Sequence, residues 1–122
     1  MEKIRIEEGE RTPLIDFNFQ TGVFVIKGRS LPEDPKKFYD PILEDLKNYL
    51  ENPAKNTVFE MKLDYFNTAS AKELLEIFDL LPKENSQINW YYYEDDNDML
   101  DAGVDYSEMT KNKIKFNFIE LV

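Results

Sequence analysis

Two hydroxyl side chains, those of Thr68 and Ser70, stand where an apolar segment gives way to a helical pattern in LDYFNTASAKELL. A hydroxyl at a helix start can serve in two ways. It can cap the helix, as the preceding Asn67 also could, by accepting a hydrogen bond from a free backbone N–H group of the first turn, or it can accept a phosphoryl group. Ser70 and Glu73 also have the spacing of a capping box. The pattern therefore leaves both a helix cap and a modification site open.

A phosphate at this position has a physical rationale. The N-terminus of a helix favours negative charge through its dipole and its unpaired N–H groups. A phosphate on Thr68 adds roughly −2 charges to the surface without changing the fold. A partner that accepts a neutral hydroxyl would reject such a dianion. Asp64, just upstream in the sequence, would repel the phosphate somewhat and so make the modified state less favourable.

Most catalytic and metal chemistry is excluded by composition. The 122 residues include no cysteine and no histidine, so a disulfide framework or a zinc site of the usual ligands cannot form. The commonest general base and the commonest soft nucleophile are missing as well. Carboxylate catalysis stays open as an alternative, but no pair of acids stands in a distinctive setting. We therefore expect a protein that is not an enzyme and has no cofactor or metal.

The charge of the chain indicates which partners it can have. Its formal net charge is −10, which disfavours nucleic acid and anionic membrane surfaces. Residues 94–108 hold seven acids and no base, but their spacing does not fit a calcium-binding loop. We interpret them as a solvated acidic face, with steering of a basic partner as the alternative. The aromatic run Trp90, Tyr91, Tyr92 and Tyr93 lacks basic neighbours and is expected in the core rather than against bases.

No membrane-inserting or exported segment is expected. The first ten residues, MEKIRIEEGE, contain no apolar stretch of the kind found in signal peptides. Residues 23–26 form the longest aliphatic and aromatic run before the first expected helix, and they are far too few to span a bilayer. The sequence thus predicts a cytoplasmic protein.

Hydrophobic periodicity predicts one α/β domain over residues 1–122. Strands are expected near residues 2–8, 14–19, 23–27, 57–65, 88–93 and 113–122, and helices over 38–50, 68–81 and, more weakly, 96–110. The resulting order is βββαβαβαβ, with an antiparallel start, a breaker-rich loop at 28–35, and right-handed crossovers that place helices on a mixed sheet. Pro41 is expected near the start of the first helix, because an interior proline would break it.

Several segments, taken in order, resemble the SiaC family of bacterial regulatory phosphoproteins. They are GRSLPE from Gly28, FYDP from Phe38, LDYFNTASAK from Leu63, WYYYEDD from Trp90 and MLDAG from Met99. The YFNTAS portion is the most specific, and the segments follow one another in the same order from residue 28 to residue 103.

The resemblance implies a fold similar to STAS-type anti-sigma-factor antagonists and a role in partner switching. It implies that a cognate serine/threonine kinase phosphorylates Thr68, that a PP2C-type phosphatase reverses this, and that the unphosphorylated form activates a target such as a diguanylate cyclase in c-di-GMP signalling. The alternative is a constitutive adaptor in which Thr68 only caps a helix. The predicted partner-binding surface comprises Gly28, Ser30, Pro32, Glu33, Tyr65, Asn67, Thr68, Ser70 and Lys72.

Overall fold

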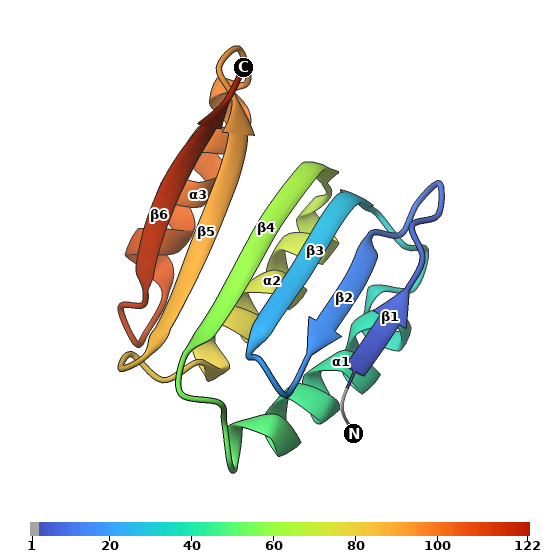
Figure 1. Ribbon diagram of the computed structural model, residues 1–122. Coiled ribbons are helices and arrows are strands. Elements are labelled where there is room, and N and C mark those ends of the chain that lie inside the picture. Colours follow the sequence, from blue (N-terminus) through green and yellow to red (C-terminus); the bar gives the residue numbers. More distant parts are fainter. Residues whose placement is uncertain (1–2) are drawn as a thin grey trace.

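The fold is one six-stranded sheet with helices packed against it (Figure 1). The computed structural model describes residues 3–122. Within them the predicted order βββαβαβαβ is confirmed. The strands are β1 (Lys3–Ile6), β2 (Leu14–Asn18), β3 (Val23–Ser30), β4 (Thr57–Phe66), β5 (Ser86–Tyr93) and β6 (Lys115–Leu121), and the helices are α1 (Pro35–Leu50), α2 (Thr68–Leu80) and α3 (Asn97–Met109).

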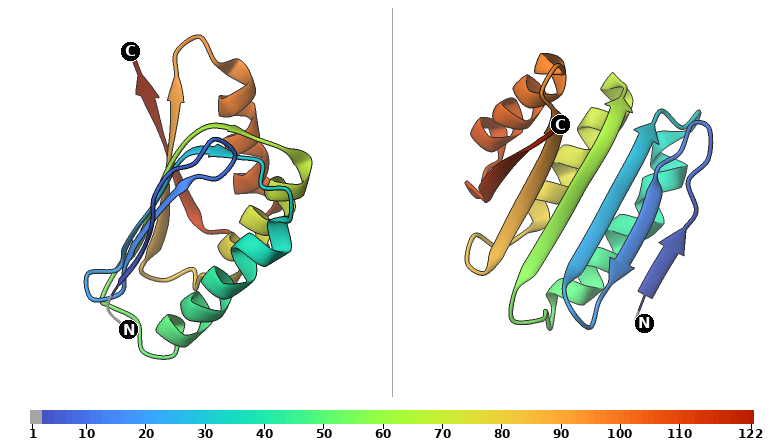
Figure 2. Two further views of the ribbon diagram at one scale, coloured as in Figure 1. Left: turned by 90° about the vertical axis from the view of Figure 1, so that its right-hand side faces the viewer. Right: turned by 45° about the horizontal axis from the view of Figure 1, so that its top comes forward.

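The strands lie in the sheet in the same order as in the chain. β1, β2 and β3 pair antiparallel, as the sequence predicted, and β3 to β6 pair parallel through the connecting helices. When consecutive crossover connections have the same handedness and each leads to the next strand in the same direction, their helices lie on the same side of the sheet. α1, α2 and α3 accordingly cover one face, and the other face carries no helix (Figure 2).

The core lies between the sheet and the helices. Alternate residues of β4 (Phe59, Met61 and Leu63) point into it and are 5% exposed or less, as their period-two pattern predicts. Phe78 of α2 packs against Phe59 with its ring nearly perpendicular, the ring centres being 6.4 Å apart. β4 is thus the central strand that joins the two halves of the sheet.

β3 is longer than the sequence suggested. Residues 28–30 were expected in a loop because Gly28 is a breaker, but they continue the strand to Ser30. Gly28 adopts a φ of 104°, and the pairing with β4 shifts by one residue between Gly28 and Arg29. This glycine therefore marks a β-bulge inside the strand rather than its end.

The expected position of Pro41 is also wrong. α1 begins at Pro35, with the side chain of Asp34 accepting a hydrogen bond from Lys37 N at 3.1 Å, so Pro41 lies inside the helix. Proline leaves the carbonyl four residues earlier without its helical N–H donor. That carbonyl belongs to Lys37, which is exposed like Pro41, so water can satisfy it.

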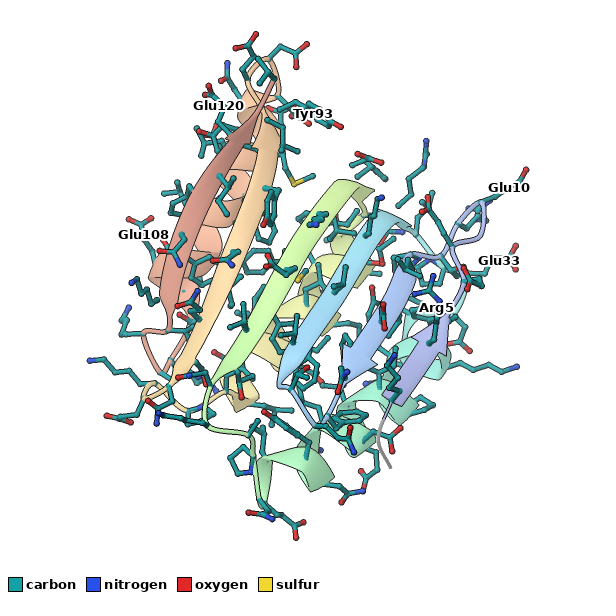
Figure 3. The ribbon with its side chains drawn as sticks, viewed as in Figure 1. Arg5, Glu10, Glu33, Tyr93, Glu108 and Glu120 are labelled. Carbon is teal, nitrogen blue, oxygen red and sulfur yellow. The ribbon has the colours of Figure 1, made fainter. Side chains whose placement is uncertain are left out.

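The aromatic run of β5 is only partly in the core. Trp90 is buried and donates a 2.9 Å hydrogen bond from Nε1 to the Met99 carbonyl. Tyr93, at the end of the strand, is 50% exposed and projects outward, which corrects the prediction for this residue (Figure 3). The reason is that the helices cover only one face of the sheet.

Gly103→Ala tests the close packing of α3 on β5. A Cβ at residue 103 would stand 2.5 Å from Trp90 Cδ1, so the helix or the indole must move. We expect overpacking of about 1–3 kcal/mol to exceed the helix-propensity gain of about 1 kcal/mol. Urea denaturation should show a lower midpoint for Gly103→Ala. Val104→Ala, at an exposed position of the same helix, should not be less stable; equal effects of both changes would contradict this packing.

Candidate functional site

The start of α2 is capped by Asn67. Its backbone is extended, and its side-chain oxygen accepts a 2.9 Å hydrogen bond from Ser70 N. Thr68 is the first helical residue and Ser70 the third. Of the three residues that could cap the helix, Asn67 therefore does so. Capping by Thr68 or Ser70, and the capping box of Ser70 with Glu73, are wrong, because a cap must precede the first turn.

The Thr68 side chain is available to other proteins. The residue is exposed, and within residues 3–122 its hydroxyl makes no hydrogen bond. It stands at the positive end of the α2 dipole, where an added phosphate would be favoured. The hydroxyl thus has the accessibility that an enzymatic modification requires and no structural role that modification would destroy.

Below the surface, a chain of buried hydroxyls fixes the helix start. Ser30 Oγ donates to Ser70 Oγ at 2.9 Å, and Ser30 Oγ lies 2.6 Å from Tyr39 Oη, so Tyr39 can donate to Ser30. Asn67 N also donates to the Ser30 carbonyl at 3.1 Å. Burial raises the pKa of Tyr39 to about 12, which keeps its proton available. β3, α1 and α2 are thereby joined at one point beneath Thr68.

The structure divides the predicted partner surface into exposed and buried members. Glu33, Tyr65, Thr68 and Lys72 are exposed, and Asn67 is half-buried. Figure 3 shows that Glu33 projects on the same side of the molecule as Glu10 in the β1–β2 loop. The remaining members are buried and lie beneath the surface rather than on it: Gly28, Ser30, Pro32 and Ser70.

One further residue beneath this surface, Glu73, was missed as a site residue in the sequence. Its side chain is 7% exposed, and its Oε2 has no hydrogen-bond partner within residues 3–122. Desolvation raises the pKa of this carboxyl, and the Lys36 ammonium, 3.8 Å from Oε1, lowers it in part. The sequence contains one signal, an acidic residue at a core-facing position of an apolar helix. Its spacing from Ser70 indicated a capping box instead.

An apolar groove runs between α2 and α3 beside Thr68. Its volume is about 250 Å³, and Tyr106 of α3 donates a 2.8 Å hydrogen bond to the Ala71 carbonyl of α2 along it. Met109 is 53% exposed at one side. The groove is lined by Phe66, Thr68, Ala71, Lys72, Leu75, Ala102, Asp105, Tyr106 and Met109. A phosphate on Thr68 would therefore stand at the wall of an apolar groove.

Two other kinds of site were sought in residues 3–122. No group of three or more Asp, Glu, His or Cys side chains is arranged to hold a metal ion. Among the same residues, every helix is too short or too polar to cross a bilayer.

Comparison with known proteins places these features in a family. Residues 6–121 match the family described as SiaC family regulatory phosphoprotein. A curated protein of Pseudomonas aeruginosa (strain UCBPP-PA14) is 25% identical over 97 residues, which cover 75% of this chain and 77% of that protein. The chain therefore belongs to the SiaC family, whose members are regulatory phosphoproteins rather than enzymes.

Solved structures show the same fold. Apo-SiaC from P. aeruginosa superposes with a TM-score of 0.85 at 22% identity, covering 98% of this chain and 99% of that one. SiaC in a crystal of the diguanylate cyclase SiaD with its activator SiaC, also from P. aeruginosa, gives 0.88 at 20% identity, covering 97% and 99%. The predicted sheet with helices packed on it is confirmed as a SiaC-like fold.

The cap assignment can be tested by comparing two neighbouring residues. Asn67→Ala removes the hydrogen bond to Ser70 N and should destabilise the protein by about 0.5–2 kcal/mol. Thr68→Ala removes no hydrogen bond and should change the stability by less than about 0.5 kcal/mol. Urea unfolding followed by tryptophan fluorescence measures both. A larger loss for Thr68→Ala than for Asn67→Ala would return the capping role to Thr68.

Glu73→Gln should stabilise the protein at neutral pH. The raised pKa means that the folded state binds the Glu73 proton more tightly than the unfolded state does, so ionisation of this residue disfavours folding. The destabilisation is present above the raised pKa and disappears as the pH falls toward the ordinary value of 4.5. Urea midpoints at several pH values should show a gain for Glu73→Gln at pH 7 that vanishes near pH 4. Glu84→Gln, at an exposed position between α2 and β5, is the matched control, and a pH-independent gain would refute the argument.

Proposed function

We propose that this chain is an activator controlled by phosphorylation, which binds a diguanylate cyclase when Thr68 is unmodified and releases it when Thr68 carries phosphate. The observation that carries the proposal is the Thr68 hydroxyl, exposed, without a capping role, and on the wall of an apolar groove. Membership of a family of regulatory phosphoproteins supports it. So does the homologous SiaC, which is described as the activator of the diguanylate cyclase SiaD.

The groove supplies a physical basis for the switch. Covering Thr68 with an apolar partner surface removes a neutral hydroxyl from water, at a cost of about 1–3 kcal/mol if it stays unpaired. Covering a phosphate dianion costs far more, because a buried charge must be paired and hydrogen-bonded. Lys72, an exposed cation on the same groove wall, could pair with only one of the two negative charges of the phosphate. Phosphorylation can therefore block binding without reshaping the domain.

The cycle needs two further proteins. A cognate serine/threonine kinase places the phosphate on Thr68, and a PP2C-type phosphatase removes it. Such a cycle runs in the cytoplasm, where a kinase finds ATP. Ser70, which the sequence left open as a second acceptor, is buried and hydrogen-bonded to Ser30, so we infer that it is not modified in the folded protein.

A constitutive adaptor is the second candidate function. It required Thr68 to serve as the helix cap, and that role belongs to Asn67. The adaptor would now be favoured only by the absence of phosphate from Thr68 in the native host.

Intact-mass spectrometry with peptide mapping tests the phosphoacceptor. We expect the cognate kinase to add one phosphate to wild type and to Thr21→Ala, which alters an exposed threonine of the β2–β3 turn, and none to Thr68→Ala. Titration against the cyclase should give near-wild-type affinity for Thr68→Ala. Thr68→Glu should bind at least tenfold more weakly and Thr68→Gln by less, because only glutamate brings a charge. Equal phosphorylation of wild type and Thr68→Ala would disprove the assignment.

A further inference from the structure

β4 and β5 separate toward their C-terminal ends (Figure 1). Their pairing runs from Thr57 with Ser86 to Met61 with Trp90. Beyond it β4 continues to Phe66 while paired with β3, and β5 continues to Tyr93 while paired with β6. In the described part of the chain, residues 62–66 of β4 and 91–93 of β5 are thus adjacent but are not paired with each other by backbone hydrogen bonds. The β4 segment is paired with β3 and the β5 segment with β6. Both segments are therefore ordered strands, each with one unpaired edge.

The space between these edges opens into connected hollows. One, of about 220 Å³, lies between β4 and β5, where the Lys62 ammonium stands 5.1 Å from the centre of the Tyr91 ring. A second, of about 310 Å³, lies between the end of β4 and the start of α3, and both hollows are lined by Asp64, Asp96 and Met99.

The second hollow also adjoins the groove beside Thr68, since Phe66 and Ala102 line both. The three hollows therefore adjoin one another in order from Lys62, past the start of α3, to Thr68 and Met109. We call this row of hollows the C-terminal cleft. It follows the C-terminal edge of the parallel strands, the edge at which open α/β sheets commonly bind ligands.

Charge changes along the C-terminal cleft. Its middle is lined by Asp64, Asp96 and Asp98, of which the last two belong to the region that holds seven acids between residues 94 and 108. Its end at Thr68 is lined mainly by apolar side chains. Complementary charge calls for a basic occupant in the middle and an apolar one at the Thr68 end. The strand edges at 62–66 and 91–93 supply backbone donors and acceptors, which suit an extended polypeptide.

We propose that the C-terminal cleft binds an extended segment of the partner protein, with lysine or arginine residues opposite Asp64 and Asp98 and an apolar side chain beside Thr68. The proposal rests on the proposed function for the identity of that partner. It adds the chemistry of the recognised segment and locates the effect of phosphate at the apolar end. The phosphate dianion would attract the basic residues of the segment, but it would also have to lose its water for the apolar residue to be buried beside it. We expect this desolvation cost to exceed the attraction, so that phosphate weakens binding.

Amide hydrogen exchange tests the docking site. The probe is the diguanylate cyclase that the proposed function assigns as partner, mixed with the full chain. We expect exchange to slow at least tenfold within residues 62–66 and 91–93 on binding, and to stay unchanged in α1 (Pro35–Leu50). Binding of the cyclase without protection at 62–66 would overturn the cleft proposal and leave the proposed function intact. Failure of the unphosphorylated chain to bind the cyclase would overturn both.

Matched charge variants test the basic segment. The pair Asp64→Asn and Asp98→Asn removes two charges from the cleft, and Glu44→Gln with Glu51→Gln removes two exposed charges from the α1 side. At about 0.1 M salt, where the screening length is about 10 Å, we expect at least tenfold weaker binding for the first pair and less than twofold for the second.

Salt then separates charge from desolvation. At about 1 M salt the screening length falls to about 3 Å, so the loss caused by the Asp64 and Asp98 pair should shrink. The loss caused by phosphate on Thr68 should remain, since it reflects burial rather than long-range charge. Equal losses for the cleft pair and the α1 pair, or a phosphate effect that disappears with salt, would contradict the proposal.

Discussion

The buried hydroxyl of Ser30 is the point on which the arrangement around Thr68 depends. It lies 2.6 Å from Tyr39 Oη and donates to Ser70 Oγ at 2.9 Å, while the Ser30 carbonyl accepts from Asn67 N. The side chain of Ser30 therefore links β3 to both α1 and α2 by hydrogen bonds. Removing it would leave two buried hydroxyls short of partners, at a cost of about 1–3 kcal/mol each. The first turn of α2 is held from below, and its outer surface is left free for Thr68.

The two faces of the sheet have different physical roles. The helix-covered face supplies the aromatic core in which Phe59, Phe78 and Trp90 pack edge to face. The uncovered face carries hydrogen-bonded polar side chains, with Asn117 donating to Asn89 at 3.0 Å. Polar side chains on an uncovered sheet face lower its tendency to associate with other sheets. Partner contacts are accordingly expected at the C-terminal edge of the strands, where apolar and acidic surfaces meet.

A switch built on this domain needs no change of fold. The hydroxyl of Thr68 is bound to nothing within residues 3–122, so modification breaks no internal hydrogen bond. The supporting network beneath it is buried and satisfied, apart from the Glu73 carboxylate with its unpartnered oxygen. Phosphate would act through the free energy of covering a charge at the surface that a partner contacts.

The sequence by itself determined the order of elements, the single domain and the acidic surface, because period-two and helical patterns report local burial directly. It also singled out Thr68, through residue types at a helix start and a resemblance to a family. It could not place the bulge at Gly28, since a glycine reads equally as a break or as a bulge. Which of Asn67, Thr68 and Ser70 caps the helix was likewise open, because all three are good caps. Tertiary structure decided these points, and it alone buried Ser30 and Ser70 against Tyr39, because contacts 9 and 40 residues apart leave no local pattern.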